Sequence, residues 1–269
     1  MRIDKELVNR NIFNSRSKAM YAINNGCVFC NGECIIKPSF DVKDDDEIVI
    51  KGEVLKYVSK GGLKLEKAIN SFNINLKDKI IIDIGSSTGG FCDCALMNGA
   101  QKIYAIDVGT NQLDQKLRND NRIIVYEQTD FRNIDINKIN DATIITMDVS
   151  FISITKLLNK IKELENVNKI ICLIKPQFEC GKDIADKYKG KPLNKDIHKN
   201  ILKDIIKEFN NINYYIENLS YSPIKGGDGN IEYISLFNKI IKKNNQININ
   251  EIVEESFKAK LKWFFFCNK

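Results

Sequence analysis

Two charged residues each follow an apolar run that has the length and composition of a buried strand. Asp148 follows residues 142–147, and Lys175 follows residues 169–174. Continuous runs of isoleucine, leucine and valine are typical of strands that a parallel sheet buries on both faces. Because residues beyond the carboxyl ends of neighbouring parallel strands meet at one edge of the sheet, we expect this carboxylate and this amine to lie side by side.

The chemistry open to such a pair is proton transfer. A lysine directly after an apolar run begins in a partly desolvated place, and desolvation favours the neutral amine that a base requires. Lys64, before the first strand of the predicted sheet, and Glu232, at the opening of its last strand, can complete a set of four catalytic residues. Taken singly, each of these residues is as easily an ion-pair partner or a helix cap.

A glycine-rich turn joins the apolar run 79–84 to a helix-like segment. Glycines let the backbone approach a ligand closely, and a helix start presents unpaired N–H groups, so we predict a nucleoside-like cofactor here. Ser86 stands where the dinucleotide fingerprint needs its second glycine, and no Gly-Lys-Ser/Thr follows as in a Walker loop. The predicted cofactor-binding residues of this turn are Asp83, Gly85, Ser86, Ser87, Thr88, Gly89, Gly90 and Phe91.

Two further strand ends carry candidate cofactor ligands. Asp107 lies near the end of the run 102–108, where nucleotide-binding α/β folds accept hydrogen bonds from ribose hydroxyls, and Val108 is its neighbour. Asp130 and Phe131 come after the third run, and Asp130 is a candidate contact to an adenine amine. The alternative for Asp107 is a helix cap or a solvated turn, and for Asp130 a surface turn.

Apolar runs alternate with helical segments beyond residue 60, which predicts a parallel sheet with right-handed crossovers. Two last strands, near residues 214–219 and 231–237, are predicted to form a hairpin at one edge. The glycine turn resembles that of S-adenosylmethionine-dependent methyltransferases. This resemblance implies S-adenosylmethionine as cofactor and a class I methyltransferase, an α/β fold with a Rossmann-like sheet of seven strands into which the seventh is inserted.

The first fifty residues follow a different pattern. They predict helices over residues 4–10 and 16–25, the second capped by Asn14 and Ser15, and a hairpin that turns at Asn31-Gly32. The motifs at residues 2–4, 15–19, 26–32 and 37–38 resemble an S4 RNA-binding domain. That resemblance implies a basic face that contacts RNA phosphates, although each side chain alone is as easily a solvated surface residue. The implied contacts are Arg2, Arg10, Arg16, Lys18, Lys37 and Lys60.

The S4 block is followed, in order, by the segments 57–65, 83–91, 148–153, 175–179 and 229–233. Together they resemble the TlyA family of rRNA (cytidine-2′-O)-methyltransferases, also known as haemolysins, over residues 1–240. The resemblance implies methylation of a ribose 2′-hydroxyl in ribosomal RNA within ribosomal subunits. Lys175 would accept or polarise the hydroxyl proton, Lys64 would lower the pKa of that amine, and Asp148 and Glu232 would orient the two amines.

The resemblance also favours one rRNA substrate, and the sequence departs from the family at one position. Family members that modify only large-subunit rRNA are shorter at the N-terminus, so a motif that starts at Arg2 favours large-subunit rRNA. Relatives have Asn where this chain has Asp130, which weakens the expected adenine contact. Three rivals are an RNA-binding assembly factor without methyl transfer, a haemolysin and a pseudouridine synthase. The four catalytic candidates argue against the first, and the glycine turn argues against the last.

Bulk properties set wider bounds. The 269 residues can hold a large and a small domain, and a net charge of +6 fits a polyanionic partner. We expect an S4 domain over residues 1–50, a linker over 51–60, a methyltransferase domain over 61–243 and a tail over 244–269. The tail holds an amphipathic stretch that we expect to pack back on the domain or on a second subunit. The sequence leaves the oligomeric state open.

The sequence gives no sign of export. No apolar run approaches the ~20 residues that cross a bilayer, and no signal peptide is evident, so we expect a cytoplasmic protein with no membrane insertion. Its eight cysteines are then expected to be reduced. Cys27, Cys30 and Cys34 are spaced like partial metal ligands, but they lack a fourth ligand nearby, so we expect no metal.

Overall fold

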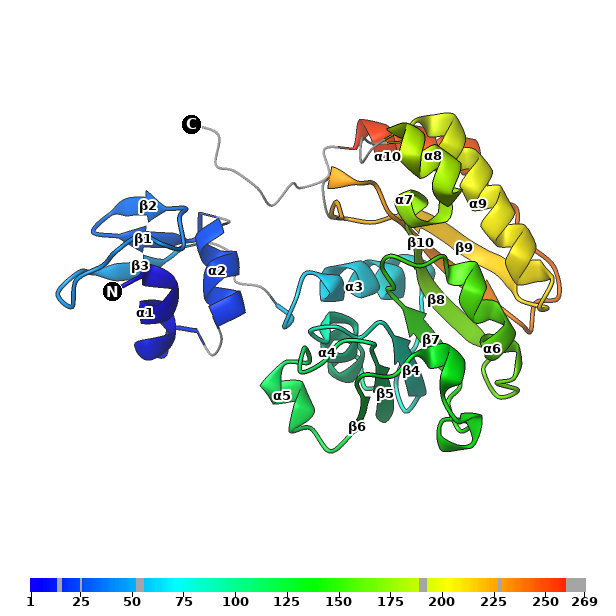
Figure 1. Cartoon of the computed structure of the whole chain (residues 1–269), viewed down its shortest axis with the longest axis horizontal. Coiled ribbons are helices and arrows are strands. Elements are labelled where there is room, and N and C mark those ends of the chain that lie inside the picture. The colour runs from blue at the N-terminus through cyan, green and yellow to red at the C-terminus, as the bar shows by residue number, and fades with distance from the viewer. Residues whose placement is uncertain (14–15, 25, 52–55, 189–192, 227–228, 260–269) are drawn as a thin grey trace. The chain divides into compact units, whose positions relative to one another are not determined.

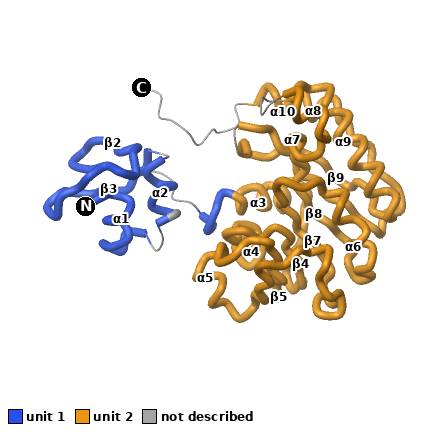
Figure 2. Tube along the Cα trace, in the orientation of Figure 1, with its two compact units in different colours: residues 1–60, 262–269 blue, residues 61–261 orange. Residues whose placement is uncertain are grey.

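The computed structural model describes residues 1–13, 16–24, 26–51, 56–188, 193–226 and 229–259 (Figure 1). The predicted cap of Asn14 and Ser15, part of the linker and the last ten residues of the tail therefore lie outside the described residues. The chain divides into two units, Met1–Lys60 and Gly61–Leu261, which Figure 2 colours separately. Each unit is described by itself.

The N-terminal unit packs two helices with a small antiparallel sheet whose strand order is β2-β1-β3. Asn31 and Gly32 have φ values of 49° and 86°, the left-handed pair that a tight two-residue hairpin requires, so the predicted turn is confirmed. The core of the unit contains Ile3, Leu7 and Ile23, each fully buried. The elements are α1 (Ile3–Asn9), α2 (Arg16–Asn24), β1 (Val28–Cys30), β2 (Glu33–Ile35) and β3 (Ile48–Ile50).

The second unit is built on a seven-stranded sheet in the order β6-β5-β4-β7-β8-β10-β9. The first five strands are parallel, as the alternation predicted, and β10 lies antiparallel between β8 and β9. The predicted edge hairpin and inserted strand are therefore confirmed. The strands are β4 (Ile80–Ile84), β5 (Lys102–Ile106), β6 (Ile123–Tyr126), β7 (Ile144–Met147), β8 (Lys169–Ile174), β9 (Tyr215–Tyr221) and β10 (Tyr233–Asn238).

Helices cover both faces of this sheet. Helices α3 and α4 pack together, as do α9 and α10, and Figure 1 shows α3 and α4 on one side of the sheet and α6 and α9 on the other. All four residues of β7 are buried, which is why the strands read as continuous apolar runs. The helices are α3 (Gly61–Phe72), α4 (Gly90–Met97), α5 (Gln115–Arg118), α6 (Leu158–Lys162), α7 (Pro176–Glu179), α8 (Gly181–Tyr188), α9 (Lys195–Asn210) and α10 (Ile249–Lys258), with short 3₁₀ turns at Phe131–Asn133, Ile136–Lys138 and Ile154–Leu157.

Helix α10 is the amphipathic stretch of the tail, and it packs against α9 and β9 of the same unit. Val253 is fully buried, and Ile252 and Phe257 pack against the core of the sheet. The expected packing of the tail on its own domain is confirmed for this helix. Within the described residues, no helix combines the length and the apolar character needed to cross a membrane.

Candidate active site

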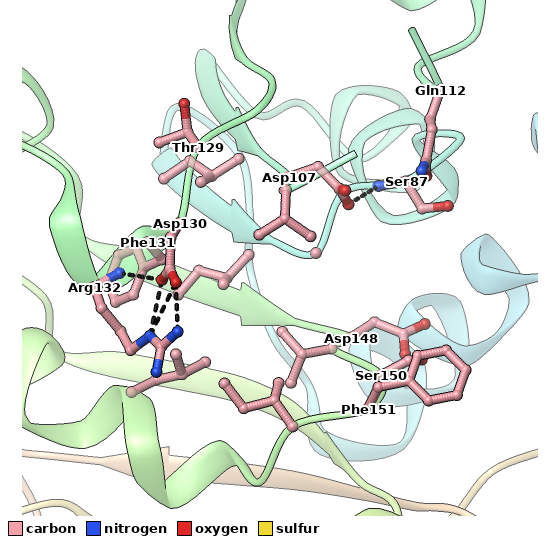
Figure 3. Close-up of a pocket in the computed structure, with 17 residues that line it drawn as sticks. Ser87, Asp107, Gln112, Thr129, Asp130, Phe131, Arg132, Asp148, Ser150 and Phe151 are labelled. Carbon is pink, nitrogen blue, oxygen red and sulfur yellow. Dashed lines mark hydrogen bonds and ion pairs between the residues drawn. The ribbon is translucent and has the colours of Figure 1, made fainter. Parts of the chain in front are cut away.

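Strand β4 lies between β5 and β7, so the order of the strands reverses at β4 and the sheet has its topological switch point there. The carboxyl ends of these three strands border a pocket of about 580 Å³ (Figure 3). Gly85 follows β4 with a φ of 80°. A Cβ atom at this position would lie 2.9 Å from the carbonyl oxygen of Asp148, so only glycine lets the two backbones approach. The pocket has the size of a cofactor site.

Asp107 anchors the glycine turn at the end of β5. Its carboxylate accepts hydrogen bonds from the backbone N–H of Ser87 at 2.8 Å and of Gly109 at 2.7 Å. A carboxylate has about four lone-pair sites, so acceptor capacity remains for ribose hydroxyls. Figure 3 shows Asp107 beside Ser87 in the pocket wall. The position therefore suits the role that the sequence predicted.

The predicted cofactor residues divide into two groups. Those that line the pocket are Gly85, Ser87, Asp107, Val108, Asp130 and Phe131. The others, which shape the turn from behind its wall, are Asp83, Ser86, Thr88, Gly89, Gly90 and Phe91. Asp83 shows what the second group does, because it is almost fully buried and accepts hydrogen bonds from Cys92 Sγ at 3.0 Å and Thr146 Oγ1 at 2.7 Å. Burial raises the pKa of Asp83 to about 6.

Asp130 is already paired within the pocket wall. Its carboxylate contacts the guanidinium of Arg132 at 2.5 Å and accepts a hydrogen bond from the backbone N–H of that residue. The hydrogen bonds from Arg132 hold the pKa of Asp130 below its ordinary value, against a smaller effect of burial. Asp130 therefore stays an acceptor, as an adenine amine would require, but it shares that capacity with Arg132.

Sequence reasoning missed other residues of this pocket. Gln112 lines it, and the backbone N–H of Gln112 donates to Glu127 at 3.0 Å. Arg118 donates to the same carboxylate at 2.6 Å, and this hydrogen bond is the main cause that lowers the pKa of Glu127 to about 2. The local sequence carries no signal for this arrangement, because the partners come from separate elements. Further lining residues that sequence reasoning missed are Thr129, Arg132, Ser150 and Phe151.

A second pocket, of about 440 Å³, contains the predicted catalytic residues Lys64, Lys175 and Glu232 in its wall. Ser150 and Phe151 line both pockets, so the two share an edge. Asp148 lines the first pocket and contacts both lysines. The structure therefore brings all four predicted catalytic residues together, although they come from α3, β7, β8 and β10 or from residues next to these elements.

Lys175 follows β8 directly, and its side-chain nitrogen lies 2.6 Å from Asp148 and 2.9 Å from the hydroxyl oxygen of Ser150. Lys175 is 6% exposed. An ammonium has three donors and a neutral amine has two donors and a lone pair, so two protein partners leave one position free for a substrate hydroxyl. The sequence predicted the pair with Asp148 but not the contact with Ser150.

Lys64 links the two carboxylates. Its nitrogen lies 2.6 Å from Glu232 and 3.7 Å from Asp148. Burial would lower the pKa of Lys64, but the charges of Asp148 and Glu232 outweigh burial and raise it. Burial would likewise raise the pKa of Asp148, and the charges of Lys64 and Lys175 lower it instead. The cluster therefore holds Lys64 charged and Asp148 ionised at neutral pH.

Phe151 stands out at the edge shared by the two pockets. Its side chain is 91% exposed, and its φ of 64° is left-handed, which is strained for a phenylalanine. Its ring centroid lies 5.1 Å from that of Phe178. Strained backbone and exposed aromatic rings concentrate at functional sites, so the position favours a ligand-contacting role. Sequence reasoning did not single out this residue.

The loop that carries Phe151 is fixed by Glu179 at the end of α7. The carboxylate of Glu179 accepts hydrogen bonds from the hydroxyl of Ser153 at 2.6 Å and the backbone N–H of Ile154 at 2.9 Å. Burial raises the pKa of Glu179, although both hydrogen bonds act against it. Because both hydrogen bonds of the Glu179 carboxylate go to Ser153 and Ile154, Glu179 positions the loop that contains Phe151.

In the N-terminal unit, three of the predicted RNA-binding arginines have protein partners. Arg2 and Arg16 both contact Asp4, at 3.0 and 2.6 Å, and Asp4 is fully buried. Burial would raise the pKa of Asp4, but the two guanidinium groups lower it. Arg10 contacts Glu6 at 2.8 Å and donates to backbone carbonyls of residues 43–46. These arginines therefore stabilise the unit, and phosphate contact stays a prediction for each.

The predicted lysines of this unit lie differently. Lys37 is exposed, and Lys18 is partly exposed. Lys60 is half-buried with its nitrogen 5.5 Å from the centre of the Tyr21 ring, and burial lowers its pKa. Their contact with RNA also stays a prediction. In the described parts of the chain, no group of three or more His, Cys, Asp or Glu residues is arranged to hold a metal ion.

Comparison with known proteins matches two families. Residues 57–239 match the FtsJ-like methyltransferase family, and residues 1–48 match the S4 domain. Hemolysin A of Brachyspira hyodysenteriae is 46% identical and covers 88% of this chain and 99% of its own. The 23S rRNA (cytidine-2′-O)-methyltransferase TlyA of Campylobacter jejuni is 40% identical and covers 84% and 94%.

A solved structure gives the same result in three dimensions. A protein from Streptococcus thermophilus that carries a hemolysin name superposes with a TM-score of 0.75 at 37% identity, over 96% of each chain. Both family matches and the site geometry agree with the motifs read from the sequence. This chain belongs to the TlyA family, in which an S4 domain precedes an FtsJ-like methyltransferase domain.

Proposed function

We propose that this protein is an S-adenosylmethionine-dependent rRNA (cytidine-2′-O)-methyltransferase that acts on large-subunit rRNA. The observation that carries the proposal is the buried cluster of Lys64, Asp148, Lys175 and Glu232 at the edge between two pockets. The Campylobacter jejuni relative, which is named for 23S rRNA, supports the choice of substrate.

The first pocket fits S-adenosylmethionine. Gly85 lets the glycine turn lie close to the backbone of Asp148, and Asp107 has acceptor capacity for the ribose hydroxyls of the cofactor. Asp130 and Phe131 would meet the adenine, with Arg132 beside them. The bound cofactor supplies a methyl group that its sulfonium has already activated for transfer. The protein must therefore hold the acceptor oxygen in line and handle its proton.

Lys175 handles that proton. A ribose 2′-hydroxyl is a weak acid, and it becomes an effective nucleophile only when its proton is accepted or polarised in the transition state. The amine of Lys175 has partners at Asp148 and Ser150 and keeps one position for the hydroxyl. Lys64 stays charged between Asp148 and Glu232, and these two ion pairs hold the carboxylate of Asp148 where it can orient Lys175.

The target nucleotide must leave its helix or come from a single strand, because a ribose stacked in a duplex cannot enter this site. Phe151 is the exposed aromatic ring at the edge of both pockets, so it can stack on the displaced base. The S4 unit supplies RNA contacts outside the site. Because the substrate is ribosomal RNA, we also place the protein in the cytoplasm.

The test is methyl transfer from radiolabelled S-adenosylmethionine to ribosomal subunits that lack the modification. Lys175→Ala should lower incorporation at least ~100-fold, because a general base typically contributes that much or more. The matched control is Lys203→Ala, since Lys203 is exposed on α9. Cofactor binding, measured by calorimetry, should persist in both variants. No incorporation by the wild type into either subunit or its precursor RNA would overturn the proposal.

A further inference from the structure

The amide of Gln177 is the polar group of the second pocket that the proposed chemistry does not use. Gln177 is the second residue of α7 and lines the pocket together with Lys64, Lys175 and Glu232. Its side-chain oxygen Oε1 is buried, and no described residue donates a hydrogen bond to it. Native proteins rarely leave a buried acceptor unsatisfied, and such an exception is often a site for a ligand donor.

The other walls of this pocket do not compete for that role. Ala185, Tyr188 and Leu193 contribute mainly apolar surface, which fits a flat ring but distinguishes bases poorly. Asn230, the second amide in the wall, already has an interaction with other protein groups. Gln177 is therefore the amide with hydrogen-bonding capacity to offer among the described lining residues.

Covalent geometry places a base next to this amide. The base is bonded to the ribose carbon adjacent to the one that carries the 2′-hydroxyl, so a hydroxyl at Lys175 brings the base into the same pocket. Gln177 lies two residues after Lys175, on the helix that begins at Pro176. A base bonded to this ribose therefore enters the pocket whose wall contains Gln177.

We propose that Gln177 recognises the target cytosine through its Watson–Crick edge. This inference rests on the proposed function and names the residue that reads the base. Cytosine presents a donor at its exocyclic amine and an acceptor at the adjacent ring nitrogen. The amide oxygen of Gln177 would accept from the amine, and the amide nitrogen would donate to the ring nitrogen. Rotation about the terminal torsion, which is broad and roughly two-fold, lets the amide adopt this orientation.

Two variants of Gln177 separate reading of the base from support of the fold. Gln177→Met keeps the length of the side chain and removes its hydrogen bonds, so kcat/KM for methyl transfer to ribosomal subunits should fall about ten- to a hundred-fold. Gln177→Glu keeps the shape of the side chain but loses the donor to the ring nitrogen, so kcat/KM on cytidine should fall as well. Gln101→Met is the control, because Gln101 is exposed. Affinity for S-adenosylmethionine should be the same in all three variants.

A change of base completes the experiment. The modified nucleotide is first mapped by mass spectrometry with the wild type, and subunits are then assembled with a pyrimidine that lacks the exocyclic amine in its place. Such a base cannot donate to the amide oxygen, so kcat/KM of the wild type should fall about ten-fold, whereas Gln177→Met has no such hydrogen bond to lose and should respond little. A variant that only disturbed the fold would still show the wild-type loss on this base.

Two outcomes would overturn the inference. One is that Gln177→Met keeps wild-type kcat/KM on cytidine, and the other is that the wild type and Gln177→Met lose equally when the base lacks the exocyclic amine. A wild type that methylates neither substrate is a different result, because it would remove the proposed function rather than the role of Gln177.

Discussion

The ammonium of Lys64 lies 2.6 Å from the carboxylate of Glu232, so a helix that precedes the sheet is joined to the strand that the chain adds last. Lys64 is 8% exposed and Glu232 is 2% exposed. A second carboxylate, of Asp148, lies 3.7 Å from the same nitrogen. The cluster of catalytic candidates is therefore also a link between the beginning and the end of the methyltransferase unit.

Removal of one member of this cluster should destabilise the protein. Lys64→Met leaves the buried carboxylates of Asp148 and Glu232 with less positive charge, so the free energy of unfolding should fall by roughly 3–5 kcal/mol. Urea denaturation measures this change. The double variant Lys64→Met/Glu232→Gln should recover much of the stability without recovering methyl transfer. If the single and double variants have equal stability, the link between Lys64 and Glu232 is not energetic.

Substitutions at two glycines with left-handed conformations, Gly85 and Gly99, should differ in their effect on cofactor affinity. Gly85→Ala would put a Cβ 2.9 Å from the carbonyl oxygen of Asp148, so affinity for S-adenosylmethionine should fall at least ~10-fold as the turn shifts. Gly99 has a φ of 85° and lies near Lys77, outside the pocket wall. Gly99→Ala should therefore cost stability but leave cofactor affinity unchanged. Calorimetry of cofactor binding by both variants decides the point.

Two buried groups predict opposite responses to acid. Burial lowers the pKa of His198 from 6.5 to about 4. The unfolded chain therefore takes up a proton before the folded protein does, and stability falls by ~3 kcal/mol as the pH drops from 6.5 to about 4. Burial raises the pKa of Asp83 from 3.8 to about 6, so the folded protein takes up this proton first. Over the same pH range that proton increases stability by a similar amount.

Single substitutions should expose each of these two contributions. His198→Gln should make stability fall less than in the wild type as the pH drops from about 6 to 4, because the loss due to His198 is removed and the gain due to Asp83 remains. Asp83→Asn should make stability fall more steeply over that range than in the wild type. Denaturant unfolding at a series of pH values measures both slopes. Equal slopes in the two variants would contradict the assignment.

Glu179 should matter for methyl transfer although it does not line either pocket. Glu179→Ala removes the acceptor for Ser153 and Ile154, so the loop that carries Ser150 and Phe151 loses its fixed position. We expect kcat to fall about 10-fold or more, since small displacements of catalytic groups are costly. Glu179→Gln, which keeps an acceptor oxygen, should retain most of the activity.

The control for this prediction is Glu163→Ala, because Glu163 is exposed and its ion pair is with Lys160 on α6. The contact between the rings of Phe151 and Phe178 supplies a second readout. If Glu179→Ala leaves both kcat and the environment of Phe151 in NMR spectra unchanged, the loop does not depend on this carboxylate.

The fold was largely predictable because its signals are local. The run that ends at Met147 and the run that ends at Ile174 are continuous and apolar, and the structure buries both strands on both faces. The Asn31-Gly32 pair was likewise a local signal, because these two residue types adopt the positive φ values that a two-residue hairpin turn requires. Asp148 and Lys175 each follow a strand, and because β7 and β8 are parallel neighbours, both residues lie at the same edge of the sheet.

The partners of each side chain were not predictable in this way. The resemblance to an S4 domain implied that Arg2 and Arg16 contact RNA, which stays a prediction, but gave no sign that both contact the buried Asp4. Asp83 belongs to the glycine turn by sequence, yet its carboxylate lies behind the pocket wall with Thr146. Such contacts join residues from separate elements, so no local pattern encodes them.

By itself the sequence determined the order of the two domains, the strands, the glycine turn and the strand ends that carry Asp148 and Lys175, because periodicity, turn chemistry and strand ends are properties of short segments. Only the tertiary structure decided the 2.6 Å contact of Lys64 with Glu232, the left-handed backbone and exposed ring of Phe151, and the unsatisfied side-chain oxygen of Gln177. The physical reason is that ion pairing, burial and strain depend on which distant segments the packed sheet brings together.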